Sequence, residues 1–197
     1  MGLDATQGFL RSALAGSNDS RGDLLEHLRP RLVLWVAGRL SAALRAQVEP
    51  EDVAQDILFA VHRDFAGFKG GEDRGFFKWF FTVAENRIRD LADHYGALKR
   101  KLPPPLSFSQ TSPSNAAARS EQVQRMMAAV GKLPDVHRQV ILLRKIEERP
   151  AAEVALILGR TENAIAVLLC RALKELSDLL RADESTPGSG APPPTLG

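Results

Sequence analysis

Four side chains that could bind an unpaired nucleic-acid base recur along one edge of a predicted helix over residues 76–95. They are an aromatic ring, a hydroxyl, an amide and a cation, at Trp79, Thr82, Asn86 and Arg89. Aromatic rings stack on bases, and an amide can both donate a hydrogen bond to a base edge and accept one from it. Taken by itself, the composition of this row is equally typical of a solvated helix face with a tryptophan at the core margin.

A second candidate DNA-binding element lies towards the C-terminal end. The pattern predicts a short helix over 151–158, a tight turn at Gly159-Arg160-Thr161 and a longer helix over 162–180. Glycine can end a helix in the left-handed conformation, and threonine can cap the next helix. This is the pattern of a helix-turn-helix, whose second helix enters the major groove, although many packed helix pairs look alike. The side chains predicted to face outward on that helix are Asn163, Val167, Cys170, Arg171 and Lys174, and those predicted to face inward are Ile165, Leu169, Ala172, Leu173, Leu176 and Leu180.

A helix predicted to begin at Pro50 carries a large aromatic residue on its polar face. Its apolar side chains gather on one side at helical spacing, and the opposite side holds Asp52, Gln55, Asp56 and Phe59. An exposed aromatic among polar residues is typical of a partner surface. The alternative is that Phe59 lies beneath the preceding helix, over 32–44.

Proline and aromatic residues divide the chain into two blocks. Residues 102–120 are rich in Pro and Ser and predict a flexible linker, and residues 182–197 predict a disordered tail. The blocks at 21–101 and 121–181, which follow an N-terminal segment 1–20, show helical spacing without strand alternation, so we expect an all-α fold of two small helical domains. Seven of the nine Phe lie between Phe59 and Phe81, and the second block has no Phe, Trp or Tyr.

Charge and composition exclude several classes of protein. The net charge is only +2, with 14 Lys and Arg against 12 Asp and Glu in the first block and 10 against 8 in the second. A protein that binds DNA tightly on its own usually carries more positive charge, so a larger partner would supply part of the affinity. With four scattered His, one Cys and no phosphate-binding glycine loop, we expect no enzyme, no metal site and no cofactor. The longest apolar run has seven residues, and the single cysteine suits a reducing cytosol, so we expect a cytoplasmic protein without membrane insertion.

Three segments in a fixed order resemble the small extracytoplasmic-function sigma factors of bacterial RNA polymerase. The segment PEDVAQDILFAVHRDFAGFKG is similar to the helix that these factors present to the polymerase clamp. RGFFKWFFTVAENRIRDL is similar to their promoter-melting helix, with Trp79 and Asn86 at the family spacing. LPDVHRQVILLRKIEERPAAEVALILGRTENAIAVLLCRALKEL is similar to their upstream-promoter reader. The resemblance covers roughly 22–100 and 121–181.

The resemblance implies partners and residue roles. It implies a non-catalytic subunit that binds core RNA polymerase, recognises promoter DNA as duplex and as melted strand, and promotes strand opening, with an anti-sigma factor as a further candidate partner. The implied contacts with polymerase are Asp52, Gln55, Asp56 and Phe59; with the minus-ten element, Phe68, Lys69, Trp79, Thr82, Asn86 and Arg89; with the minus-thirty-five element, Arg160, Thr161, Asn163, Ala166, Val167, Arg171 and Lys174.

Two departures and one rival class accompany this interpretation. His62 stands where family members often carry an aromatic residue, and Ala166, Val167 and Leu168 stand where they commonly carry Lys or Arg with Ser. The rival is a stand-alone helix-turn-helix regulator whose first block dimerises or senses a ligand. That class predicts DNA binding without polymerase, and it leaves the aromatic edge and the 19-residue linker without a role.

Overall fold

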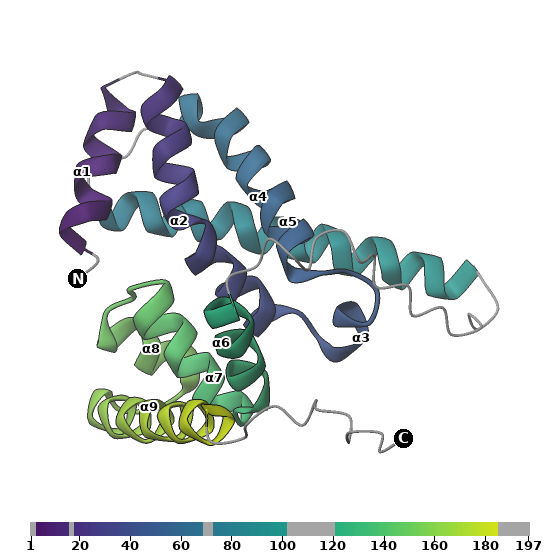
Figure 1. Ribbon diagram of the computed structural model, residues 1–197, viewed down its shortest axis with the longest axis vertical. Coiled ribbons are helices and arrows are strands. Elements are labelled where there is room, and N and C mark those ends of the chain that lie inside the picture. The colour runs from purple at the N-terminus through teal and green to yellow at the C-terminus, as the bar shows by residue number, and fades with distance from the viewer. Residues whose placement is uncertain (1–2, 16–17, 69–72, 102–120, 185–197) are drawn as a thin grey trace, which may run out of the picture.

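The computed structural model describes residues 3–15, 18–68, 73–101 and 121–184. Over this part of the chain the fold is entirely helical, and its helices form two groups that pack against each other (Figure 1). The predicted all-α class is confirmed. The predicted linker, 102–120, lies outside the described residues. So does the predicted tail, 182–197, except for residues 182–184, which form the end of the C-terminal helix.

The first group is built around one long central helix, α2 (Asn18–Arg39). Its elements are α1 (Leu3–Leu14), α2 (Asn18–Arg39), α3 (Ala42–Arg45), α4 (Pro50–Asp64), the 3-10 turn η1 (Phe65–Gly67) and α5 (Asp73–Lys101). Helix α2 contacts α1 and α4 within the group and α6 of the second group. The segment expected only as an N-terminal stretch therefore contains a helix, α1, which buries Leu10 and Ala13 in the first core.

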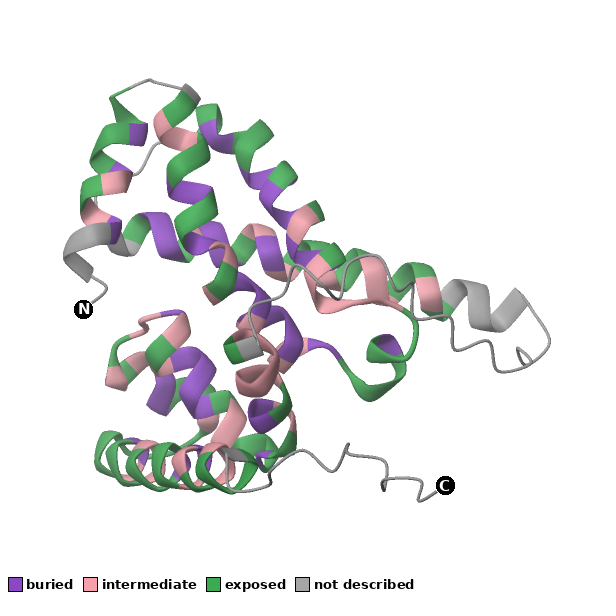
Figure 2. Cartoon of the chain, in the orientation of Figure 1, coloured by how far each residue is buried: buried purple, intermediate pink, exposed green. Residues whose placement is uncertain are grey.

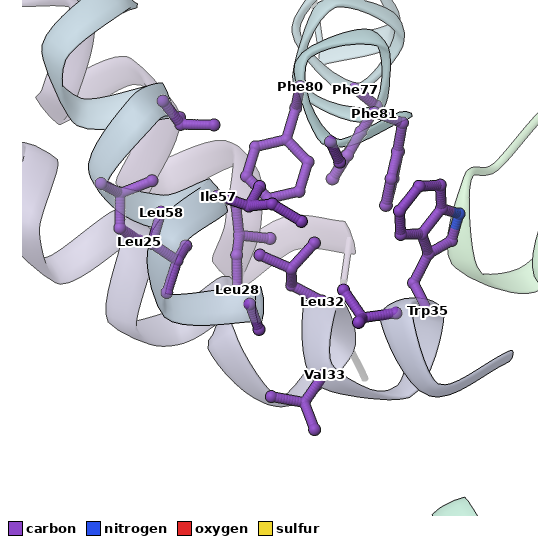
Figure 3. Close-up of a cluster of buried hydrophobic side chains, with 14 of the residues drawn as sticks. Leu25, Leu28, Leu32, Val33, Trp35, Ile57, Leu58, Phe77, Phe80 and Phe81 are labelled. Carbon is purple, nitrogen blue, oxygen red and sulfur yellow. The ribbon is translucent and has the colours of Figure 1, made fainter. Parts of the chain in front are cut away.

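Buried side chains from α2, α4 and α5 form the core of the first group (Figure 3). Trp35, Ile57 and Phe80 are among its fully buried members, and the Trp35 and Phe81 rings lie 5.3 Å apart. Burying each such side chain stabilises the fold by about 1.5–3 kcal/mol. Most of the phenylalanines clustered between positions 59 and 81 belong to this core. The buried ones are Phe65, Phe76, Phe77, Phe80 and Phe81.

The second group is a compact helical unit with its own aliphatic core. Its elements are α6 (Glu121–Lys132), α7 (Asp135–Ile141), the π-helical turn η3 (Leu142–Ile146), α8 (Ala151–Leu158) and α9 (Glu162–Glu184). Val140, Val154, Ile165 and Ala172 are fully buried in it. Figure 2 shows that α9 keeps one long face exposed while its other side covers the core.

The two groups meet at one side of α2. The added Cβ of any larger residue at Gly38 would lie 2.8 Å from Leu142 Cδ1, so α2 and η3 approach closely there. Leu142 is buried in the core of the first group although it belongs to the second. No periodic pattern in the sequence indicates this contact, because its two sides lie more than a hundred residues apart.

Candidate nucleic-acid interface

The helix-turn-helix predicted from the sequence is present between α8 and α9. Gly159 ends α8 with φ of 61°, a left-handed conformation that glycine adopts without steric cost. The Arg160 amide donates to the Ala155 carbonyl at 2.9 Å and closes the end of the helix. Thr161 then caps α9, because its Oγ1 accepts a hydrogen bond from the Ala164 amide at 3.2 Å. The turn therefore fixes the angle at which α9 leaves α8.

The outward face of α9 is exposed and mostly uncharged. All seven residues predicted for the minus-thirty-five contact are exposed: Arg160, Thr161, Asn163, Ala166, Val167, Arg171 and Lys174. Val167 exposes 44% of its surface, an unusual fraction for valine on a helix with a covered side. The prediction that Leu173 faces inward is wrong: it is 36% exposed, because Ala172 and Leu176 already occupy the line facing the core. This face can offer three cations to phosphates and an apolar patch to base methyl groups.

The row of candidate base-binding residues on α5 begins at the core margin and continues into solvent. Trp79 is half-buried, and its ring lies 5.1 Å from that of Phe68 and 6.1 Å, edge-on, from that of Phe65. The simpler interpretation of Trp79, as an aromatic residue at the core margin, therefore describes its packing, although part of its ring stays accessible. Phe68 is likewise half-buried, and Lys69 lies outside the described residues.

The polar members of the row are exposed and already oriented. Thr82 Oγ1 donates to the Lys78 carbonyl at 2.7 Å, which leaves its lone pairs free to accept. Arg89 Nη1 donates to Asn86 Oδ1 at 3.1 Å. The Arg89 guanidinium thereby holds the amide plane of Asn86, which lies about one turn before Arg89 on α5. An amide whose oxygen is engaged in this way still has its NH2 group to donate, and a base edge could accept from it.

The candidate polymerase face on α4 is largely exposed. Phe59 is 64% exposed, so the alternative that places it beneath the preceding helix is wrong. Asp52 and Asp56 are exposed, and Gln55 is half-buried. The opposite side of α4 is buried from Val53 to Val61. The core contacts of α4 are made by that buried side, and Phe59 is not part of the core.

A buried carboxylate that sequence reasoning missed connects the two groups of helices. Glu147 Oε1 accepts from the Trp35 indole at 2.8 Å and from Arg39 Nη2 at 2.6 Å, and Glu147 Oε2 accepts from Arg149 Nε at 2.6 Å. Arg31 reaches the same segment, donating to the Ile146 carbonyl at 2.7 Å and to Glu148 Oε1 at 2.8 Å. The only signal in the sequence is the spacing of Arg31, Trp35 and Arg39, which places them on one side of α2.

The hydrogen bonds decide the charge state of Glu147. Burial alone would raise the pKa of this carboxyl, but the hydrogen bonds from Trp35, Arg39 and Arg149, together with the Arg39 charge, outweigh burial. The pKa of Glu147 therefore lies below its ordinary value. Burial would lower the pKa of Arg149, yet its contacts with Glu147 and Glu153 raise it. Both groups are ionised at neutral pH.

Two further classes of site are absent from the described ranges. No group of three or more His, Cys, Asp or Glu side chains there could hold a metal ion. None of the described helices combines the length and apolar character that crossing a membrane requires.

A two-part helical protein with a helix-turn-helix, and with a separate helix offering an aromatic and amide row, has an architecture typical of DNA-binding proteins. The family model described as "Sigma-70, region 4" matches residues 123–176, which lie between α6 and the middle of α9. An ECF RNA polymerase sigma factor, SigD of Mycobacterium tuberculosis, is 28% identical over 182 residues, covering 89% of this chain and 82% of SigD. The RNA polymerase sigma factor CnrH of Cupriavidus metallidurans is 29% identical over 192 residues, covering 91% of this chain and 96% of CnrH.

Among solved structures, the sigma factor RpoE in complex with the anti-sigma factor NepR from Bartonella quintana is 20% identical. That match has a TM-score of 0.47 and covers 85% of this chain and 99% of the other. The family model and the sequence relatives agree: this chain is similar to RNA polymerase sigma factors, including one of the ECF family.

The ionised state of Glu147 predicts how stability depends on pH. Because its pKa is lowered on folding, its contribution is complete above the ordinary glutamate value of about 4.3 and is lost as the pH falls through the lowered value. Replacing Glu147 by Gln should reduce the free energy of unfolding at pH 7 by about 1–2 kcal/mol, since charge-assisted hydrogen bonds become neutral ones. Urea unfolding at pH 7, 5 and 3 measures the difference between parent and variant, which should shrink at the lowest pH.

The matched control is Glu26→Gln, because the Glu26 side chain is 71% exposed and pairs with Arg29 on the same helix. An exposed pair of this kind contributes little, so the control should unfold like the parent at each pH. A difference between parent and Glu147→Gln that stays the same from pH 7 to 3 would show that the charge of Glu147 does not stabilise the fold.

Proposed function

We propose that this protein is a non-catalytic subunit that binds core RNA polymerase, recognises promoter DNA and promotes strand opening at the start of transcription. The observation that carries the proposal is the capped helix-turn-helix of α8 and α9 within the segment matched by the sigma-70 region 4 model. The first group of helices adds what a stand-alone regulator does not need, an exposed α4 face and an aromatic row on α5. The cytoplasm is the proposed site of action, and an anti-sigma factor is a further candidate partner.

One role is proposed for each of three surfaces: the α4 face, the α5 row and the outward face of α9. The α4 face with Asp52, Asp56 and Phe59 would dock on polymerase. The α5 row would hold an unstacked base of the non-template strand in the minus-ten element. The outward face of α9 would contact the minus-thirty-five duplex, where Ala166 and Val167 offer apolar contact to thymine methyl groups.

The small net charge agrees with this division. A chain of +2 gains little from the counterion release that dominates nonspecific DNA binding. A polymerase that holds the DNA would supply that affinity, and contacts of this chain would then select the sequence. In vitro transcription with core polymerase plus this protein on genomic fragments tests the proposal. Promoter-specific transcripts support it, and DNA binding at palindromic sites without polymerase would favour the stand-alone regulator instead.

Truncation of Phe59 should weaken binding to core polymerase. Phe59→Ala removes a large exposed ring that α4 does not need for its own packing, and central aromatic residues of an interface typically contribute enough that affinity falls about tenfold or more. Asp56→Arg should weaken binding as well, by reversing a charge on the same face. Affinity for core enzyme is measured by fluorescence anisotropy of labelled protein, and circular dichroism checks that the helices are retained.

Leu14→Ala is the control for Phe59→Ala, because Leu14 is also a large exposed apolar residue of the first group, at 40% exposure, but lies on α1. It should bind core polymerase as the parent does. Parental affinity of both Phe59→Ala and Asp56→Arg would remove the α4 face from the proposal.

Loss of the Asn86 amide should impair promoter opening. Asn86→Ala deletes the group that Arg89 orients, so fewer open complexes should form on intact duplex, and base preference should blur at one promoter position. Permanganate reactivity of unpaired thymines measures the opening. His94→Ala, an exposed change two turns further along α5, should leave it intact. Unchanged reactivity together with unchanged base preference in Asn86→Ala would exclude this role.

The charge on the outward face of α9 limits how strongly duplex binding depends on salt. The cations predicted to meet phosphates there are Arg160, Arg171 and Lys174, all exposed, and each neutralised phosphate adds about 0.9 to the log–log salt slope. Binding of the full chain to upstream promoter duplex should thus show a slope of at most about 3, and Arg171→Ala should lower it by about 0.9.

Titration at several salt concentrations gives the slope. Lys132→Ala, which removes an exposed cation from α6 instead, should not change it. A slope well above 3 would mean that cations elsewhere carry the duplex contact.

A further inference from the structure

The first two outward-facing turns of α9 carry no cation. In a helix-turn-helix, the N-terminal residues of the second helix contact the base edges. The outward-facing residues of these turns are all exposed: Glu162, Asn163, Ala166, Val167 and Cys170. None of them is Lys or Arg, and paired hydrogen bonds from Lys or Arg to O6 and N7 are the commonest way to recognise guanine. This part of α9 must therefore distinguish base pairs by other means.

Three of these residues form a small apolar patch on the outward face. Cys170 follows Ala166 by four positions and Val167 by three, so it is a neighbour of both on the helix surface. A cysteine side chain behaves as a small hydrophobic group. The core of the second group is filled from the other side of α9, by Ile165 and Ala172. The patch is thus left in water (Figure 2), and its apolar surface is removed from water only when a partner covers it.

The major groove of DNA displays an apolar group that such a patch can cover, the C5-methyl group of thymine. Contact between this methyl group and an apolar side chain is an established form of base recognition. 5-Methylcytosine carries the same group at the same ring position. The neighbouring polar residues are compatible with this contact, because Asn163 can bond to N6 and N7 of adenine, and Glu162 can accept from the amino group of cytosine.

The size of the patch and the charges around it fit a short run of base pairs. From Asn163 to Cys170 the helix rises about 10 Å, at about 1.5 Å per residue. Neighbouring base pairs lie about 3.4 Å apart, so this length corresponds to about three of them. Exposed cations lie before the patch, at Arg160, and beyond it, at Arg171 and Lys174. Phosphate contacts at both ends would position the helix and leave the base edges to the patch.

We propose that α9 recognises the 5-methyl groups of pyrimidines in the major groove, and that Val167 is the residue that selects them. Thymine and 5-methylcytosine are the two bases that carry this group, so methylation of cytosine would create a contact at a position where cytosine alone offers none. The inference rests on the duplex contact proposed for α9, and it names the bases that this contact selects.

Selection from three duplex libraries tests the inference with the full-length protein, alone and together with core polymerase. Each library has a randomised window of one duplex turn, about ten base pairs. The first contains thymine, the second contains uracil in its place, and the third contains uracil together with 5-methylcytosine in place of cytosine. The first should yield thymine at two or three adjacent positions, the second should lose this preference, and the third should yield 5-methylcytosine instead.

Fluorescence anisotropy of the selected duplexes measures the effect of each methyl group. Replacing one contacted thymine by uracil should weaken binding about fourfold, because one methyl group fewer is removed from water. A duplex with 5-methylcytosine should bind about fourfold more tightly than the same duplex with cytosine. Both ratios should be the same at every salt concentration, since contact with a methyl group releases no counterion from the DNA.

Val167→Ala separates contact with the methyl group from an effect of DNA shape. The truncated side chain no longer covers the methyl group, so duplexes with thymine and with uracil should bind this variant almost equally. A preference that arises from the stiffness of the duplex would persist in the variant. Val136→Ala is the matched control, because Val136 is also an exposed valine of the second group, at 38% exposure, but lies on α7. It should keep the fourfold ratio of the parent, and circular dichroism checks that both variants stay helical.

The outcomes distinguish this inference from the function on which it rests. Equal selection and equal binding of thymine and uracil duplexes by the parent overturn the inference. A ratio that survives in Val167→Ala overturns it as well, and so does the absence of any selection with and without core polymerase. Failure of the proposed function is measured separately, as the absence of promoter-specific transcripts with core polymerase. A methyl preference that persists in that case would belong to a stand-alone regulator.

Discussion

The arrangement of the molecule depends on one buried carboxylate that receives hydrogen bonds from both groups of helices. Glu147 is buried in the second group, and a buried charge without donors would be strongly unfavourable. Two of its three donors, Trp35 and Arg39, belong to α2. Docking therefore supplies two of the three hydrogen bonds that offset the burial of the Glu147 charge. Figure 3 shows the indole nitrogen of Trp35 turned away from the phenylalanine rings and towards the ribbon of the second group.

Local signals in the sequence were sufficient for the helix-turn-helix. Gly159 and Thr161 define the end of α8 and the start of α9, because each acts through its own backbone conformation or cap and needs no distant partner. The exposure of Phe59 could also be predicted from the local sequence, since the apolar side of α4 was complete without it. The helix α1 was missed although Leu10, Ala13 and Leu14 follow helical spacing in it. The error at Leu173 arose because periodicity shows a direction but not where the core ends.

The candidate site could be predicted only in part. Trp79, Thr82 and Asn86 were placed on one edge by helical spacing, and that edge exists. What the sequence could not indicate is that residues 147–150 of the second group line a crevice with Phe77, Lys78 and Phe81 of the same helix. Such a contact depends on pairs such as Arg31 with Glu148, separated by 117 positions, and no periodic pattern connects residues so far apart.

The uneven distribution of aromatic residues has an optical consequence. Since the second group of helices contains no Phe, Trp or Tyr, it is almost silent in near-ultraviolet absorption and emission. Trp35 nevertheless lies at the boundary, with its ring in the first core and its N–H bonded to Glu147. Its emission maximum and quenching thus respond to the presence of a neighbour that has no chromophore of its own. With Trp79 replaced by Phe, the remaining tryptophan becomes an intrinsic reporter of how the two halves of the molecule meet.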